Sequence, residues 1–205
     1  MEIKLKYLTS CKPQKLNVMP IEILSKVVNG IKGGVEATLK GSADVGSSVA
    51  HAVRDVTVTT LKGVGDLAVK GIQLPASVVA GAIHGVAAVG ATVVRSIKGI
   101  VDGTIQGAMK AGVSQEDAVK GSVKQAILSA RDLGADVGGV AVEAVKGAVS
   151  GVKQVGGDTV SATGHAVSAA LDAAKEIGSE ALSSVQKALD ESVEGAKSVL
   201  KEVKS

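Results

Sequence analysis

Apolar and polar residues recur along this chain with a period of 22 residues. Counted from Ile23, each unit places apolar residues at positions 1, 5, 9, 13 and 17 and small residues at positions 12, 16 and 20. Positions 13 and 17 carry Val, Ile or Leu in most units, for example Val79, Ile83, Val101, Ile105, Val123, Ile127, Val145, Val149, Val167 and Leu171. Spacings of three and four residues lie on one face of an α-helix, whereas strand residues alternate. The pattern predicts an all-α protein of amphipathic helices.

The repeat divides the chain into two parts. We expect an N-terminal arm or tail at residues 1–19 and a helical repeat region at residues 20–205, with about eight units that begin at residues 23, 45, 67, 89, 111, 133, 155 and 177. In the first part, Ile3, Leu5 and Tyr7 alternate with lysines, which indicates a short extended segment. This segment is either a tail or an arm that pairs with a neighbouring molecule.

Glycine occupies position 2 of most units, and we interpret these residues as helix-ending glycines: Gly46, Gly90, Gly112, Gly134, Gly156 and Gly178. A glycine after a helix can adopt the left-handed conformation that closes it, and a Ser, Thr or Asp N-cap then starts the next helix. Such a residue follows in most units, at Ser48, Thr92, Ser114, Asp136 and Asp158. We therefore predict helices of about 15–20 residues separated by tight turns or kinks. Both stacked antiparallel helices and one long kinked helix fit these signals.

A second row of glycines lies at position 19, beside the apolar stripe. We interpret these residues as close-packing glycines: Gly41, Gly63, Gly85, Gly107, Gly151 and Gly195. The missing side chain lets another backbone approach closely. A glycine inside a helix also costs about 0.5–1 kcal/mol relative to alanine. The helices are therefore expected either to pack tightly on one another or to form only on a surface.

Basic residues recur at positions 10 and 21 and form the candidate lipid- or partner-facing row: Lys32, Arg54, Lys98, Lys120, Arg131, Lys153, Lys175 and Lys197. In a helix that keeps an 11-residue phase, these residues fall on one side, next to the apolar sector. Their stems can then lie on apolar surface while the charges reach a layer of lipid headgroups. The alternative is ordinary packing of basic side chains along a seam between helices.

Composition and charge restrict the partners. Tyr7 is the single aromatic residue, so a core must be built from Val, Ile, Leu and Ala, and we do not expect a nucleic-acid partner bound by base stacking. Residues 1–110 carry 13 Lys and Arg against 7 Asp and Glu, whereas residues 111–205 carry 10 against 13. This asymmetry fits an anionic surface contacted by the first half, head-to-tail self-association, or a solvated face without a partner.

Residues 71–94 carry no Asp, Glu, Lys or Arg, a length that could span a bilayer. We favour an unusually apolar repeat unit, because Gln73, Pro75 and His84 interrupt the segment and it keeps the repeat register. Cys11 is the only cysteine, which excludes an intrachain disulfide and indicates a free thiol in a reducing compartment.

The sequence contains no recognisable catalytic or metal-binding constellation. His51, His84 and His165 share no repeat position and belong to no metal motif. No set of nucleophile, base and acid departs from the repeat pattern. We therefore expect a non-enzymatic protein without a metal or a cofactor.

The segment VSGVKQVGGDTVSATGHAVSAAL at residues 149–171 has the Val, Gly, Thr, Ala and Lys composition of synuclein, and the chain shares its basic, apolar, acidic order. Residues 23–203 thus resemble the amphipathic-repeat proteins: apolipoproteins, synucleins, perilipins and late-embryogenesis-abundant proteins. The likeness is one of period and composition, without the synuclein Lys-Thr-Lys-Glu-Gly-Val hexamer or the apolipoprotein proline at each junction. The resemblance implies reversible coating of lipid or granule surfaces.

Two functions from different classes follow from these patterns. The leading hypothesis is a cytoplasmic protein, peripheral to a membrane or granule, that coats an anionic lipid surface with positions 13 and 17 inserted. The alternative is a self-assembling structural protein, a homo-oligomeric bundle, sheet or filament held by Gly, Ala and Val packing. A stress-protectant role is third. The first two hypotheses differ in what the apolar stripe contacts, lipid or other helices.

Overall fold

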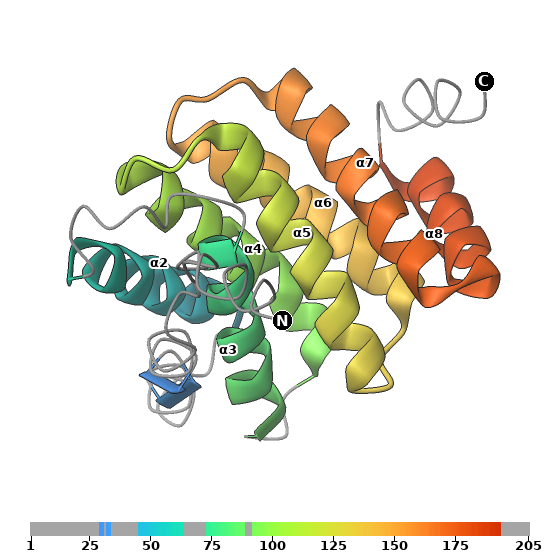
Figure 1. The fold of residues 1–205 in the computed structure, drawn as a ribbon, viewed down its shortest axis with the longest axis horizontal. Helices are drawn as coiled ribbons and strands as arrows, with labels where there is room; N and C mark the ends of the chain where they lie inside the picture. Colours follow the sequence, from blue (N-terminus) through green and yellow to red (C-terminus); the bar gives the residue numbers. More distant parts are fainter. Residues whose placement is uncertain (1–28, 31, 34–44, 64–72, 89–91, 194–205) are drawn as a thin grey trace, which may run out of the picture.

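The computed structural model describes residues 29–30, 32–33, 45–63, 73–88 and 92–193, and these ranges are helical apart from short connections. The helices are α2 (Val45–Gly63), α3 (Gln73–Ala88), α4 (Val93–Lys110), α5 (Gln115–Asp132), α6 (Val137–Gln154), α7 (Thr159–Ile177) and α8 (Ser179–Ser192). They pack into a bundle (Figure 1). The all-α prediction is confirmed, and the described chain folds back on itself rather than forming one long kinked helix. The arm at residues 1–19 lies outside the described residues.

The helices alternate between two layers. Helices α2, α4, α6 and α8 form one layer, and α3, α5 and α7 form the other (Figure 1). Helices α4 and α6 run parallel, because their contacts advance together: Gly147 of α6 lies against Lys98 of α4, and Gly151 lies against Asp102 one turn later. Each helix therefore packs most closely on the helix two places away in the sequence.

Three turns between helices close in the same way around a glycine. After α4, the Gly112 N–H donates to the Met109 carbonyl and the Val113 N–H donates to the Ala108 carbonyl, both at 3.0 Å. The equivalent bonds follow α5 and α6. This Schellman pattern requires a left-handed residue. The glycines have the positive φ values it needs, 89° at Gly112, 68° at Gly134 and 75° at Gly156.

The other helix-ending glycines differ. Gly178, at φ 144°, is the single residue between α7 and α8. Its N–H donates to the Ala174 carbonyl and its carbonyl accepts from the Leu182 N–H, each at 3.0 Å. Gly46 lies in the first turn of α2, and Ser48 lies inside the same helix, so the predicted helix end and N-cap are wrong there. Glycine permits a left-handed residue but does not impose one. Gly90 is outside the described residues.

Short polar side chains start the later helices. Carboxylate oxygens of Asp136 and of Asp158 accept the backbone N–H groups two and three residues later, at 2.9–3.2 Å. Ser114 Oγ accepts the Asp117 N–H at 3.1 Å, which is half of a capping box. Thr92 occupies the N-cap of α4 without a side-chain bond. These caps satisfy N–H groups that a helix leaves free at its start.

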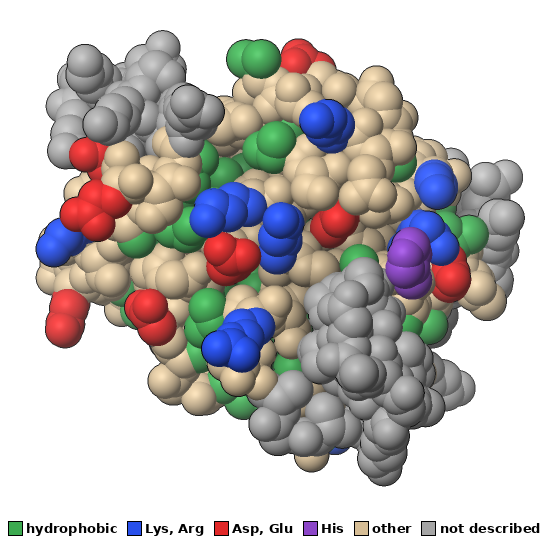
Figure 2. Space-filling view, turned by 180° about the vertical axis from the view of Figure 1, so that it is seen from behind, with side chains coloured by type: hydrophobic (Ala, Val, Ile, Leu, Met, Phe, Trp, Pro, Cys, Tyr) green, Lys and Arg blue, Asp and Glu red, His purple; other side chains and the backbone are tan. Residues whose placement is uncertain are grey.

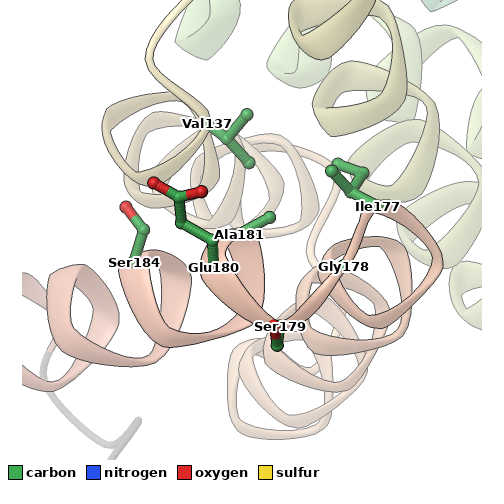
Figure 3. Close-up of a pocket in the computed structure, with 7 residues that line it drawn as sticks. All are labelled: Val137, Ile177, Gly178, Ser179, Glu180, Ala181 and Ser184. Carbon is green, nitrogen blue, oxygen red and sulfur yellow. The ribbon is translucent and has the colours of Figure 1, made fainter.

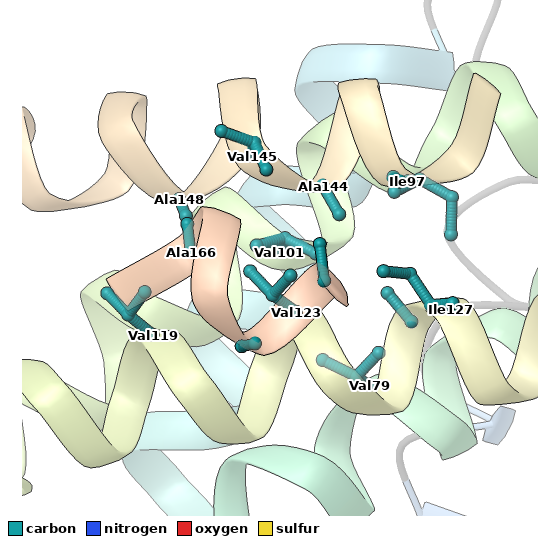
Figure 4. Packing of buried hydrophobic residues seen from close by; sticks show 14 of the residues in the cluster. Val79, Ile97, Val101, Val119, Val123, Ile127, Ala144, Val145, Ala148 and Ala166 are labelled. Atoms are coloured by element: carbon teal, nitrogen blue, oxygen red, sulfur yellow. The ribbon is translucent and has the colours of Figure 1, made fainter. Parts of the chain in front are cut away.

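The core lies between the layers and consists of small aliphatic side chains (Figure 4). Side chains at positions 13 and 17 are at most 1% exposed at Val79, Ile83, Val101, Ile105, Val123, Ile127, Val145, Val167, Leu171 and Leu189. Alanines such as Ala144, Ala148 and Ala166 fill the space between them. Burying each Val, Ile or Leu contributes about 1.5–3 kcal/mol. Many such residues together supply the buried apolar area that aromatic side chains provide in most cores.

The uncharged segment at residues 71–94 supplies α3. Nine residues of this helix are buried, among them Leu74, Val78 and Val86, and Pro75 lies in its first turn. Among the described residues, no helix combines the length and the apolar character that crossing a membrane requires.

Candidate functional site

The histidines lie on three different helices. His51 on α2 and His84 on α3 are exposed, and His84 Nδ1 lies 2.7 Å from the Ala80 carbonyl of its own helix. His165 on α7 is half-buried, and its buried Nδ1 atom has no hydrogen-bond partner among the described residues. In the described ranges, His, Cys, Asp and Glu side chains form no group of three or more that could hold a metal ion.

The predicted basic row is divided between the two layers. Arg54, Lys98 and Lys153 lie on α2, α4 and α6, whereas the other layer carries Lys120, Arg131 and Lys175 on α5 and α7. The chain reverses at each glycine turn, so a row that is continuous along one helix is split by the fold. Lys32 is half-buried, and Lys197 lies outside the described residues.

Two of the predicted close-packing glycines contact the neighbouring parallel helix. A Cβ atom at Gly107 would lie 2.6 Å from Thr57 Cβ, and one at Gly151 would lie 2.9 Å from the Asp102 carbonyl oxygen. Gly85 is buried in α3, and Gly63 is the last residue of α2. The remaining two, at positions 41 and 195, lie outside the described residues.

The closest helix contacts involve glycines that lie outside the rows at positions 2 and 19. A Cβ atom at Gly103 would lie 2.3 Å from the Ala50 carbonyl oxygen, and one at Gly147 would lie 2.5 Å from the Lys98 carbonyl oxygen. Each of these glycines is four residues before a position-19 glycine, on the same helix face. The Gly-x-x-x-Gly spacing was therefore the available signal. It allows backbone to lie on backbone along both α2–α4 and α4–α6.

A buried carboxylate lies in the seam between α4 and α6. Asp102 is 8% exposed. It accepts Gln106 Nε2 at 2.7 Å, Ser150 Oγ at 3.2 Å and Gln154 Nε2 at 2.9 and 3.1 Å. These neutral donors satisfy an ion whose burial would otherwise be costly. The sequence showed only an acidic residue inside an apolar helix, and nothing in the pattern named its partners.

An open depression of about 470 Å³ lies where α7 meets α8, beside the start of α6. Val137, Ile177 and Ala181 form its apolar part, and Figure 3 shows the Glu180 carboxylate and the Ser184 hydroxyl beside them. Because Glu180 lies in the first turn of α8, it already supplies the negative charge that a helix amino terminus favours.

Charges on α5 and α7 are paired locally. Lys120 Nζ lies 2.5 Å from Glu116 Oε1, and this hydrogen bond holds the pKa of Glu116 below its ordinary value. Lys124 of α5 pairs with Glu176 of α7. The other cations of these two helices, at positions 131 and 175, also have a carboxylate within 4.0 Å. On α2, Arg54 likewise lowers the pKa of Asp55 through a hydrogen bond.

Charges in the other layer are paired less completely: among the described residues its ion pairs are Arg54 with Asp55 and Lys146 with Glu143. On α4 and α6, four exposed cations have no ion-pair partner among the described residues, and we call them the basic face: Arg95, Lys98, Lys110 and Lys153. On α8, three exposed carboxylates are also unpaired there, and we call them the acidic set: Glu180, Asp190 and Glu191. The fold thus exposes unpaired charges of both signs on one molecule.

Comparison with known proteins adds no family: no protein-family model and no curated protein sequence matches this chain.

Proposed function

We propose that this chain is a non-enzymatic structural protein whose helices form a self-supporting scaffold that assembles with further copies. The observation that carries the proposal is the burial of positions 13 and 17. Ten of these side chains are at most 1% exposed inside the bundle. An apolar stripe that is buried within the folded chain is not available for insertion into lipid.

The 22-residue unit is part of this proposal. Helices α4 to α7 begin at Val93, Gln115, Val137 and Thr159, each 22 residues after the one before. We propose that about eight such units stack in the same way, since repeat architectures bury each unit's apolar face against its neighbours. Close contacts through Gly103 and Gly147 recur two units apart, which supports one packing rule for the layer.

Coating of a lipid or granule surface is the competing function. It would require the bundle to open, because the residues that would insert form the core. In the described residues, the large apolar side chains that remain exposed are Leu133 and Val160, at 39% and 81%. Leu133 lies in the turn between α5 and α6, and Val160 lies in the first turn of α7. Two such separated side chains do not form a stripe that could insert into lipid.

Circular dichroism of the full chain, with and without anionic phospholipid vesicles, tests the proposal. We expect strong helicity and cooperative unfolding without lipid, unchanged by vesicles, and an apparent mass above that of the monomer in light scattering. A largely disordered chain that becomes helical only on vesicles would overturn the structural function.

A matched pair of variants sharpens this test. Ile127→Ala removes a fully buried side chain, and we expect it to lower the free energy of unfolding in the absence of lipid by about 2–5 kcal/mol. Val160→Ala removes a side chain that is 81% exposed, and we expect a change within about 0.5 kcal/mol. If the core exists only on lipid, both variants would behave alike without vesicles.

A further inference from the structure

The basic face consists of exposed cations that form no ion pair with any described residue. Figure 2 shows Lys and Arg side chains near the middle of the side formed by α4 and α6, with Asp and Glu side chains among them. Arg95 and Lys98 are one turn apart on α4, and Lys98 lies directly beside the Gly147 segment of α6. Of the five cations on these two helices, only Lys146 has a carboxylate within 4.0 Å, that of Glu143 at 3.3 Å. Four of the five cations are therefore unpaired among the described residues, although Lys110 also helps to lower the pKa of Asp55 on α2 by its charge.

The acidic set gives one end of the same layer the opposite sign. Glu180, Asp190 and Glu191 on α8 are exposed and unpaired within the described residues, and Lys187 is the only cation of this helix. Helix α8 packs on α6 and α7, so it is the last described helix of the layer. Unpaired charges of opposite sign on separate surfaces attract one another between molecules.

We infer that the basic face binds the acidic set of a second copy of this chain. This inference rests on the proposed self-assembly and specifies its contact. The two surfaces differ, so the contact is heterologous: each copy offers both halves and can continue a chain or close a ring. Helix α8 exposes mainly polar side chains on its outer side, which makes charge rather than apolar area the attraction there.

Other anionic partners fit the basic face less well. Neither Leu133 nor Val160, the exposed large apolar residues of the described ranges, lies on α4 or α6, so the face has nothing to insert into a membrane. The described residues also contain no aromatic side chain on which a nucleic-acid base could stack. A second copy needs only the charges that the chain itself provides.

Charge reversal tests the contact in the full chain. The first variant carries Lys98→Glu and Lys153→Glu on the basic face, and the second carries Asp190→Lys and Glu191→Lys on the acidic set. A control carries Arg131→Glu and Lys175→Glu, which makes the same charge change on the other layer. Sedimentation velocity at about 50 mM and about 500 mM salt measures association, because added salt screens exposed charges.

We expect wild-type chains to associate at low salt and to separate at high salt. Each charge-reversal variant alone should require at least about tenfold higher concentration to associate, and an equimolar mixture of the two should recover association, because every contact again joins opposite charges. The control should behave like the wild type. Circular dichroism of all variants checks that the helices are intact.

Other results separate the contact from the proposed function. If the wild type assembles and the reversed variants assemble equally, the charge contact is wrong but self-assembly stands. If helical wild-type chains remain monomeric at every salt concentration, both are wrong. If monomers bind phosphatidylserine vesicles and the Lys98→Glu, Lys153→Glu variant does not, the basic face serves a lipid surface and the self-contact is overturned.

Discussion

Replacing Gly147 by alanine sets local helix preference against tertiary packing. In an isolated helix, this change stabilises by about 0.5–1 kcal/mol, because glycine has the greater conformational entropy to lose. In the fold, the new Cβ atom would lie 2.5 Å from the carbonyl oxygen of Lys98 and 3.1 Å from its Cα atom. These are backbone atoms, so a side-chain rotation cannot relieve the overlap.

The cost follows from how far α6 must retreat from α4. Ordinary contacts of a Cβ atom begin near 3.4 Å, so the carbonyl contact at 2.5 Å must lengthen by about 0.9 Å. A gap of 0.5–1 Å already loses about a quarter to a half of the attraction between packed atoms. Overpacking of this kind costs about 1–3 kcal/mol. We therefore expect Gly147→Ala to lower the free energy of unfolding by up to about 2.5 kcal/mol after the helix gain is included.

Gly164 on α7 provides the matched control. It also lies inside a helix, but nothing is within 4 Å of its Cβ position. Gly164→Ala should therefore stabilise by about 0.5–1 kcal/mol. Urea unfolding followed by circular dichroism gives both values, and the midpoints should move in opposite directions. If Gly147→Ala stabilises the protein as Gly164→Ala does, parallel backbone packing between α4 and α6 does not govern stability.

Three further predictions concern polar groups. Asp102→Ala leaves the buried Gln106 amide without this acceptor and should lower the free energy of unfolding by about 2 kcal/mol in urea titration; an unchanged midpoint would refute the buried network. Asp136→Ala removes two cap bonds and should cost about 1 kcal/mol, whereas Thr92→Ala, which has no cap bond to lose, should change little by the same assay. Lys120→Met should raise the pKa of Glu116 towards its ordinary value in an NMR titration. If the pKa of Glu116 does not change in this variant, the pairing is wrong. Because the pKa of Glu116 is lowered in the folded state, the stabilisation from this pair is present at neutral pH and is lost as the pH falls through the folded pKa.

Glycine turns and caps were largely predictable because they depend on neighbours in the sequence. Gly112, Gly134 and Gly156 adopt the left-handed conformation that their spacing predicted, and Asp136 and Asp158 cap the helices that follow. Thr92 occupies a predicted cap position without making the expected bond. A local pattern thus placed most helix ends where both partners lie within a few residues.

The basic row shows where local reasoning fails. Lys98 and Lys120 share position 10 of their units, yet they lie in different layers, and Lys120 is paired with Glu116 while Lys98 is unpaired. Their periodicity describes position around a helix axis. It does not state which way the chain turns after Gly112, and this turn decides which charges share a surface.

The sequence by itself determined the helices, their apolar faces and most of their ends, since these follow from side-chain spacing and from the conformational freedom of glycine. The sequence also indicated that the apolar stripe must be buried, but it did not show whether lipid or other helices bury it. Only the tertiary structure decided that other helices of the same chain cover it, that α4 and α6 run parallel through Gly147, and that Asp102 meets Gln154 across 52 residues. Contacts between distant segments depend on shape and register between elements, which no periodic pattern within one element records.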